Sequence, residues 1–200
     1  MHPHHLTLDD IADLRAYERE RDAFRAHVIA LKKRRRVHVG PILTLVFENR
    51  DTIRFQIQEM ARVEKLLTDE AIQTELDTYN PLIPEPGQLC ATVFLELTSD
   101  EQLREWLPKL VGIERSLVLR VGEGDDVLDL RAITEEAHAG QLTREEVTAS
   151  VHYVRWELDP AQVDRVERGP VRLVVDHPSY LEEAELSATT VAELVQDLRG

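Results

Sequence analysis

The residues best suited to chemistry stand together where an apolar run meets an amphipathic one. The apolar run from Ile42 to Phe47 is followed at once by Glu48, Asn49, Arg50 and Asp51. The end of a strand that leads directly into a helix gathers carboxylates, guanidiniums and free backbone N–H groups at one place. Such a junction can hold an anionic ligand, because arginine forks and helix N-termini both favour negative charge.

The amphipathic run after this junction carries polar side chains four residues apart, and residues at this spacing share one face of a helix. The pattern predicts a ligand-binding site made of Glu48, Asn49, Arg50, Asp51, Arg54, Gln58 and Arg62. The alternative is a lattice of ion pairs that docks the helix on its neighbours, with each exposed pair contributing about 0–1 kcal/mol. We favour the lattice, because nearly every arginine here has an acidic residue close to it in the sequence.

Histidines and carboxylates on the expected strands suggest a second kind of site. His152 shares a strand face with apolar residues, and His177 ends another strand. Together with Glu48 and Glu96 they form a candidate metal site for iron, manganese or zinc, because imidazole and carboxylate are ligands of these ions. The alternative for each histidine is a hydrogen-bonded residue of the core.

Composition excludes several classes of protein. The chain of 200 residues has a formal charge of −14 and one cysteine, Cys90, so a disulfide framework or a thiolate zinc site within one chain is excluded. Nucleotide-binding glycine loops and the common hydrolase motifs are absent. The acidic balance makes nucleic acid an unfavourable partner, although the run Lys32–Arg36 could form a local RNA-binding patch. No apolar run is long enough to cross a membrane.

Periodicity predicts an α+β fold: a mainly antiparallel sheet packed with two long helices in the N-terminal half and shorter C-terminal helices. Residues 1–6 are expected to form a flexible tail with histidines, and residues 7–200 a single domain. With no signal-like segment, a cytoplasmic location is expected. Residues 127–146 fit a strand or a helix equally well. The principal elements expected are a helix that starts after Thr7 and ends at Lys32–Arg36, strands at Val37–Phe47, Leu89–Leu97, Leu117–Val121, Val147–Leu158 and Val171–Val175, a helix at Asp51–Thr78, short helices after Ser99 and Asp159, and a last helix after Ser187 or Thr189.

Five segments resemble a bacterial family catalogued as domain of unknown function 3501. They are Phe47–Thr52, Gln58–Glu64, Glu75–Pro81, Val151–Arg155 and Val174–Pro178. The resemblance extends over nearly the whole chain and implies one full-length domain. It also implies genes beside rubrerythrin-type genes, and so a link to peroxide or iron handling. It implies no catalytic residues.

Three functions follow as hypotheses. The first is an accessory protein of this metabolism that binds a rubrerythrin-type partner protein, a metal, or both. The second is an enzyme in which Glu48, Asp51 and Glu96 act as acid–base groups and arginines orient an anion. The third, RNA binding through Lys32–Arg36, lacks the interleaved aromatic residues that stack on bases. The depth of the site distinguishes the first two, because an enzyme needs its groups to converge in a pocket.

Overall fold

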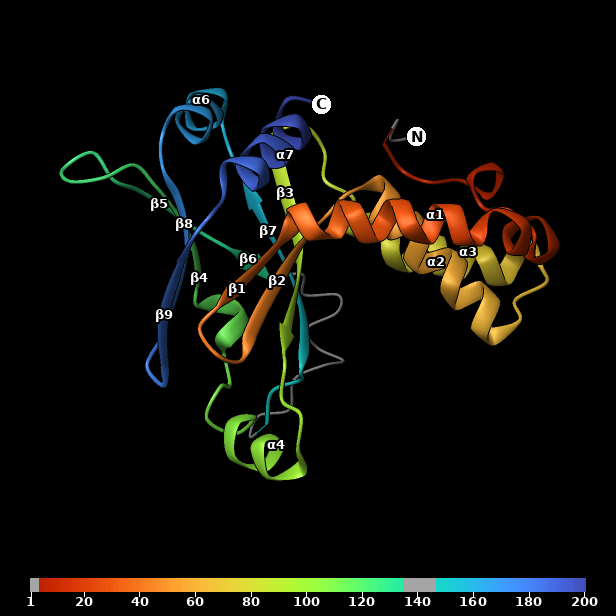
Figure 1. The fold of residues 1–200 in the computed structure, drawn as a ribbon, viewed down its shortest axis with the longest axis horizontal. Coiled ribbons are helices and arrows are strands. Elements are labelled where there is room, and N and C mark those ends of the chain that lie inside the picture. The colour runs from red at the N-terminus through yellow and green to blue at the C-terminus, as the bar shows by residue number, and fades with distance from the viewer. Residues whose placement is uncertain (1–3, 135–146) are drawn as a thin grey trace.

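The chain folds around two antiparallel sheets, seen in a computed structural model that describes residues 4–134 and 147–200. The first sheet has the strand order β1-β2-β3-β7-β6 and the second β5-β4-β8-β9 (Figure 1). The first consists of β1 (Arg36–Val39), β2 (Leu43–Glu48), β3 (Gln88–Leu95), β7 (Val151–Glu157) and β6 (Ile133–Thr134). The second consists of β5 (Leu128–Arg131), β4 (Leu117–Val121), β8 (Val171–His177) and β9 (Tyr180–Glu185). The α+β prediction is confirmed, with two sheets in place of one.

The main core lies between the two sheets. Alternate residues of the strands point inward, because successive side chains of a strand face opposite sides. Phe47 of β2 and Trp156 of β7 meet at 5.9 Å between ring centroids, and the Trp156 indole donates a hydrogen bond to the Leu130 carbonyl. Three helices pack around the sheets: α4 (Asp100–Trp106), α6 (Pro160–Arg168) and α7 (Ala188–Arg199). Asp159 caps α6, as predicted, and Ser187, one of the two predicted starting points, caps α7.

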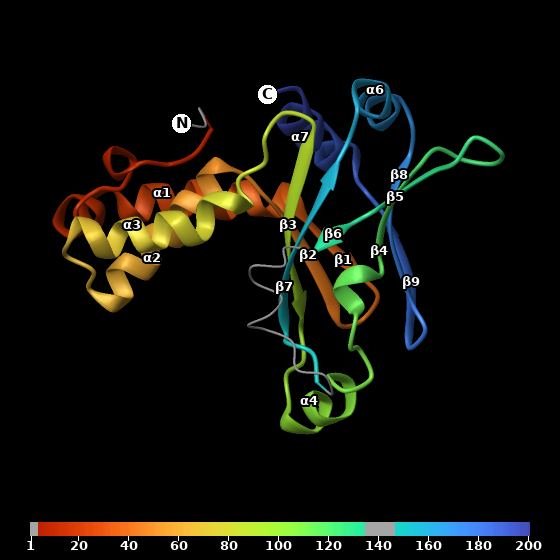
Figure 2. The same cartoon turned by 180° about the vertical axis from the view of Figure 1, so that it is seen from behind.

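Three further helices form an arm that projects from one side of the first sheet (Figures 1 and 2). They are α1 (Leu14–Arg35), α2 (Arg50–Glu64) and α3 (Asp69–Tyr79). The arm has a small core of its own, centred on Ile53, Ile57 and Leu76. Leu6 belongs to that core, and its backbone N–H and C=O both bond to the Asn80 side chain, so the expected flexible tail does not extend to Leu6.

The long helix predicted at Asp51–Thr78 is wrong, because the chain breaks it into α2 and α3. Lys65 takes a left-handed backbone conformation (φ 55°) at the end of α2, and Thr68 caps the start of α3. The strand predicted at Val37–Phe47, with an interruption at Gly40-Pro41, is a hairpin of β1 and β2. Gly40 makes the turn with φ 66°, and a Cβ there would come within 2.5 Å of the Tyr180 hydroxyl.

In two regions the structure contains strands that the sequence did not predict. β9 has no counterpart among the predicted strands, although it pairs along its whole length with β8. In the ambiguous span 127–146, the structure places β5 and β6, while residues 135–146 lie outside the described residues. Within the described ranges, no helix is long and apolar enough to cross a membrane.

Candidate functional site

The predicted junction between a strand and a helix is present, and a single residue, Asn49, separates β2 from α2. Asn49 is the N-cap of α2: its side chain accepts a hydrogen bond from the Thr52 N–H, and the Thr52 hydroxyl accepts one from the Asn49 N–H. This reciprocal pair satisfies two backbone donors and fixes the direction of the helix. Arg50 and Asp51 therefore occupy the first turn, where helix N–H groups lack intrahelical partners.

The arginines of α2 face the N-terminal segment and α1. Arg50 pairs with Asp10 at 2.6 Å. Arg54 donates a hydrogen bond to the Asp10 backbone carbonyl at 2.8 Å and pairs with Glu20 at 3.2 Å. The Arg54 guanidinium also lies 4.8 Å from the centre of the Phe24 ring, which adds a cation–π contact. Both guanidiniums are therefore used to hold the arm together.

Gln58 and Arg62, which lie further along the same face of α2, also contact the N-terminal segment and α1. Gln58 is buried, and its amide exchanges two hydrogen bonds with the backbone of Ala12. Arg62 pairs with Glu18 of α1. The favoured interpretation, an ion-pair lattice between helices, describes the arrangement of Arg54 and Arg62, and Gln58 adds neutral hydrogen bonds to it.

The sequence did not indicate one further ionic contact of this interface, at Glu59. The Glu59 carboxylate accepts hydrogen bonds from Tyr17 and from two nitrogens of Arg21, each at 2.8 Å. The Arg21 guanidinium lowers the pKa of Glu59, and burial raises the pKa of Tyr17. Glu59 could have been found only from its partners on α1, more than 35 residues earlier in the chain.

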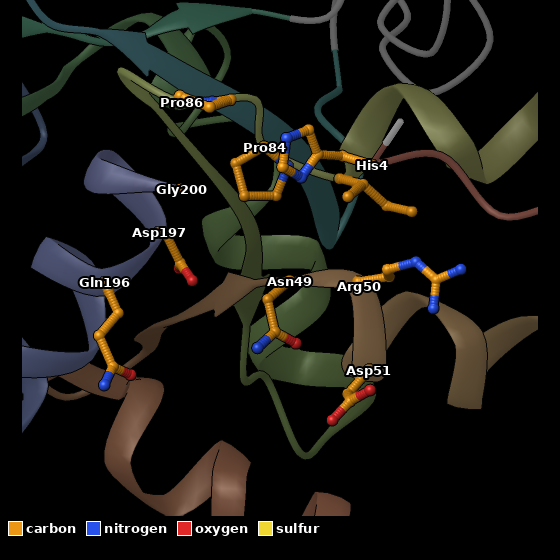
Figure 3. Close-up of a pocket in the computed structure, with 10 residues that line it drawn as sticks. His4, Asn49, Arg50, Asp51, Pro84, Pro86, Gln196, Asp197 and Gly200 are labelled. Atoms are coloured by element: carbon orange, nitrogen blue, oxygen red, sulfur yellow. The ribbon is translucent and has the colours of Figure 1, made fainter. Parts of the chain in front are cut away.

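A pocket of about 310 Å³ opens at the start of α2 (Figure 3). Four separate segments surround it: the N-terminal segment, the β2–α2 junction, the proline-rich stretch before β3, and the end of α7. It is lined by His4, Asn49, Arg50, Asp51, Ile83, Pro84, Pro86, Gln196, Asp197 and Gly200. Three of the seven predicted ligand-binding residues therefore meet here, together with residues of α7 that the sequence did not connect to them. We call this the α2 pocket.

A buried ion pair beside the α2 pocket joins α1 to α7. Arg35 is 2% exposed and donates hydrogen bonds to both carboxylate oxygens of Asp197, at 2.6 and 3.0 Å, and to Glu193 at 3.1 Å. Burial raises the pKa of Asp197, and the charge of Arg35 opposes that shift. On the other side of the pocket, Asp51 contacts His27 at 2.9 Å. The pocket thus has two carboxylates, each with a cationic or imidazole partner.

The four predicted metal ligands do not meet in the structure. Glu48 is 2% exposed, and one of its carboxylate oxygens accepts a hydrogen bond from Thr92 at 2.6 Å, while the other has no hydrogen-bond partner among residues 4–134 and 147–200. Glu96 is exposed just beyond the far end of β3, whereas Glu48 lies opposite Cys90 near its beginning. Six residues of strand separate these positions, a distance of roughly 20 Å.

The two histidines have partners of their own. The Nε2 atom of His152 lies 2.8 Å from the Ala149 carbonyl, so this nitrogen carries the proton, and Nδ1 lies 4.0 Å from Glu114. Burial lowers the pKa of His152, and the Glu114 carboxylate opposes that shift. His177 belongs to the other sheet and bonds to the Val111 carbonyl. Among residues 4–134 and 147–200, no three His, Cys, Asp or Glu side chains are grouped to hold a metal ion.

The basic run Lys32–Arg36 is partly neutralised by α7. Arg34 pairs with Glu193, and Arg35 pairs with Glu193 and Asp197. Because these pairs remove two of the five cations from the exposed patch, the structure weakens the case for an RNA-binding face at this position.

The fold and the junction define a class of α+β protein in which two antiparallel sheets carry a three-helix arm and a polar pocket at the arm's base. The family model described as "Protein of unknown function (DUF3501)" matches residues 5–198, so the chain belongs to this family. A solved structure of a novel protein of unknown function from Burkholderia pseudomallei is similar to it. That chain is 39% identical, with a TM-score of 0.87, and the match covers 96% of this chain and 98% of that one. No curated protein matches the chain.

Proposed function

We propose that this protein is an accessory binding protein whose α2 pocket receives part of a partner protein. The observation that carries the proposal is the composition of the pocket wall, where His4, Asn49, Asp51 and Gln196 come from three segments. Imidazole, amide and carboxylate groups together offer both hydrogen-bond donors and acceptors, which suits recognition of a polar group.

Binding is favoured over catalysis because the acid–base groups of the enzyme hypothesis are dispersed. Of Glu48, Asp51 and Glu96, only Asp51 lines the α2 pocket. General acid–base chemistry requires the groups to lie within reach of one reacting atom. The arginines that would orient an anionic substrate are engaged by Asp10, Glu18 and Glu20 instead.

For the identity of the partner, the proposal follows the family resemblance: a rubrerythrin-type protein, and through it peroxide or iron metabolism. Calorimetry with the rubrerythrin-type protein encoded in the same genome tests this. Gln196→Trp fills the α2 pocket from an exposed helix position, and Gln73→Trp is a matched change on an exposed face of α3. We expect binding that Gln196→Trp abolishes and Gln73→Trp preserves. Equal binding by both variants, or none by the parent protein, would refute the proposal.

The accessory-protein hypothesis also includes metal binding, which is tested by measuring the metal content of the purified protein. Elemental analysis follows purification from medium supplemented with iron, manganese and zinc. A stoichiometric metal that survives dialysis would assign the protein to metal handling through a site other than the four predicted ligands, because these do not meet. A metal content near zero would leave partner binding as the function.

A further inference from the structure

Helix α7 has three faces, and two of them contact the rest of the protein. Leu194 and Leu198 pack into the main core, and Asp197 faces Arg35 of α1. The third face is apolar and partly exposed, because Ala188 and Ala192 are exposed while Val191 and Val195 are half-buried against the main core. Its residues recur at the spacing i, i+3, i+4 and i+7, so they form one stripe along the helix. The stripe consists of Ala188, Val191, Ala192 and Val195.

This stripe forms one wall of a groove of about 490 Å³, which we call the α6–α7 groove. Gly169 and Pro170, which follow α6, form the opposite wall. Val171 and Leu186 are buried at its base, and the Leu186 N–H donates a hydrogen bond to the Val171 carbonyl at 2.8 Å. Because its base is tied to the sheet, the groove is preformed.

The charged residues that line the groove are both acidic. They are Glu167 at the end of α6 and Glu185 at the end of β9, with side chains 53% and 65% exposed. Arg199 contacts one oxygen of Glu167 but shares the same nitrogen with Asp164, and Arg172 lies 4.0 Å from Glu185. The groove therefore combines an apolar base with two exposed carboxylates, each of which shares its arginine with a second acid, on a chain whose net charge is −14.

We propose that the α6–α7 groove binds a basic amphipathic helix of a partner protein. The small side chains of Ala188 and Ala192 let a second helix approach to about 8 Å between axes, the close end of the usual range. Apolar residues at positions i and i+4 of that helix would pack against Val191 and Val195. Its flanking lysines or arginines would then meet Glu167 and Glu185, which orients the helix and rejects acidic competitors.

A second copy of this chain does not fit the groove as well. A two-fold dimer places the same surface patch on both sides of the contact. The acidic rims would face each other across an apolar seam, and two chains of charge −14 would repel. An anionic membrane surface is excluded by the same repulsion.

The probe is a displayed library of helix-forming peptides with random surface positions, selected against the whole protein. Selected sequences are synthesised and their affinity is measured by fluorescence anisotropy. We expect them to combine apolar residues at i and i+4 with flanking lysine or arginine, and to shift the NMR signals of the Val191 and Val195 methyl groups. Selection of acidic peptides, or of none, would overturn the proposal, as would self-association of the protein through this groove.

Matched variants separate the groove from general effects. Ala192→Trp fills the groove, and Ala26→Trp makes the same change at an exposed position of α1. We expect affinity to fall at least about tenfold in the first and less than about twofold in the second. Glu185→Lys should weaken binding by roughly fivefold at low salt, because rim charges act mainly on association.

Glu183→Lys changes the net charge equally at an exposed site of β9 outside the groove, and should leave affinity unchanged. Peptides whose affinity is the same for Ala192→Trp and the parent protein would refute the assignment. The α2 pocket is tested independently, because Gln196→Trp should leave peptide affinity intact. Failure of the rubrerythrin-type partner to bind would therefore not count against the groove.

Discussion

Replacing Arg35 tests whether the buried ion pair holds the arm to the sheets. Arg35→Met keeps the apolar stem but removes three hydrogen bonds and the positive charge. Glu193 keeps Arg34 as a partner, so the uncompensated charge is that of Asp197, whose side chain is 12% exposed. Breaking a buried pair by removing one partner costs about 3–5 kcal/mol, and we expect that loss in the free energy of unfolding.

The double variant Arg35→Met with Asp197→Leu removes both charges and provides the control. Its stability should return to within about 1 kcal/mol of the parent protein, because the penalty comes from the orphaned charge rather than from lost packing. Urea unfolding followed by circular dichroism measures all three proteins. A loss below about 1 kcal/mol in the single variant, or an equal loss in the double one, would refute this reasoning.

The ion pair of Arg35 and Asp197 also predicts how the stability of Arg35→Met depends on pH. The pKa of Asp197 is raised by burial, and without Arg35 it must rise further. A carboxyl group with a raised pKa in the folded state binds its proton more tightly there, so it destabilises the fold as pH rises above the unfolded value of about 3.9. The deficit of Arg35→Met should therefore be smaller at pH 5 than at pH 7. An unchanged or larger deficit at pH 5 would contradict the assignment.

Two further predictions concern buried titratable groups. Thr92→Val should reduce the free energy of unfolding by about 2 kcal/mol, because it removes the hydrogen bond that the Thr92 hydroxyl donates to the Glu48 carboxylate. The loss should be smaller in a Glu48→Gln background, and an equal loss in both backgrounds would argue against that contact. NMR titration should place the pKa of His152 below its usual value and lower still in Glu114→Gln, with a protonated Nε2 throughout. Because the folded pKa of His152 is depressed, its contribution to stability should decrease as pH falls below about 6.5, so the pH dependence of unfolding in this range should be smaller in His152→Gln.

Elements with strong local signals were predictable from the sequence. Asp159-Pro160 marks the start of α6, and the alternation from Leu89 to Leu95 marks β3. β9 was missed because its sequence Tyr-Leu-Glu-Glu-Ala-Glu is rich in glutamate, which is depleted in strands, and its pairing with β8 depends on tertiary context. The break at Lys65 was missed because a lysine with positive φ has no sequence signal.

For the candidate site too, only the residues that depend on local sequence could be predicted. The junction of strand and helix followed from local sequence, although the predicted helix began at Asp51, whereas α2 is capped by Asn49 and begins at Arg50. The side chains that complete the α2 pocket come from α7, about 150 residues later, and no periodicity connects the two segments. The partners of Arg54 and Arg62 on α1 could not be predicted from the sequence either, because ion pairs between helices depend on how the arm packs.

The position of β9 at the border of its sheet has a consequence for how the protein behaves in concentrated solution. Edge strands present unpaired backbone groups that invite pairing with another molecule, and charged side chains discourage it. Glu182, Glu183 and Glu185 are exposed on this strand, next to an exposed Leu181. Protonating these carboxylates in acid would remove the repulsion between the β9 strands of two molecules. The edge of the sheet, with its exposed Leu181, would then be free to pair. Acid conditions should therefore promote edge-to-edge aggregation, and storage above neutral pH should prevent it.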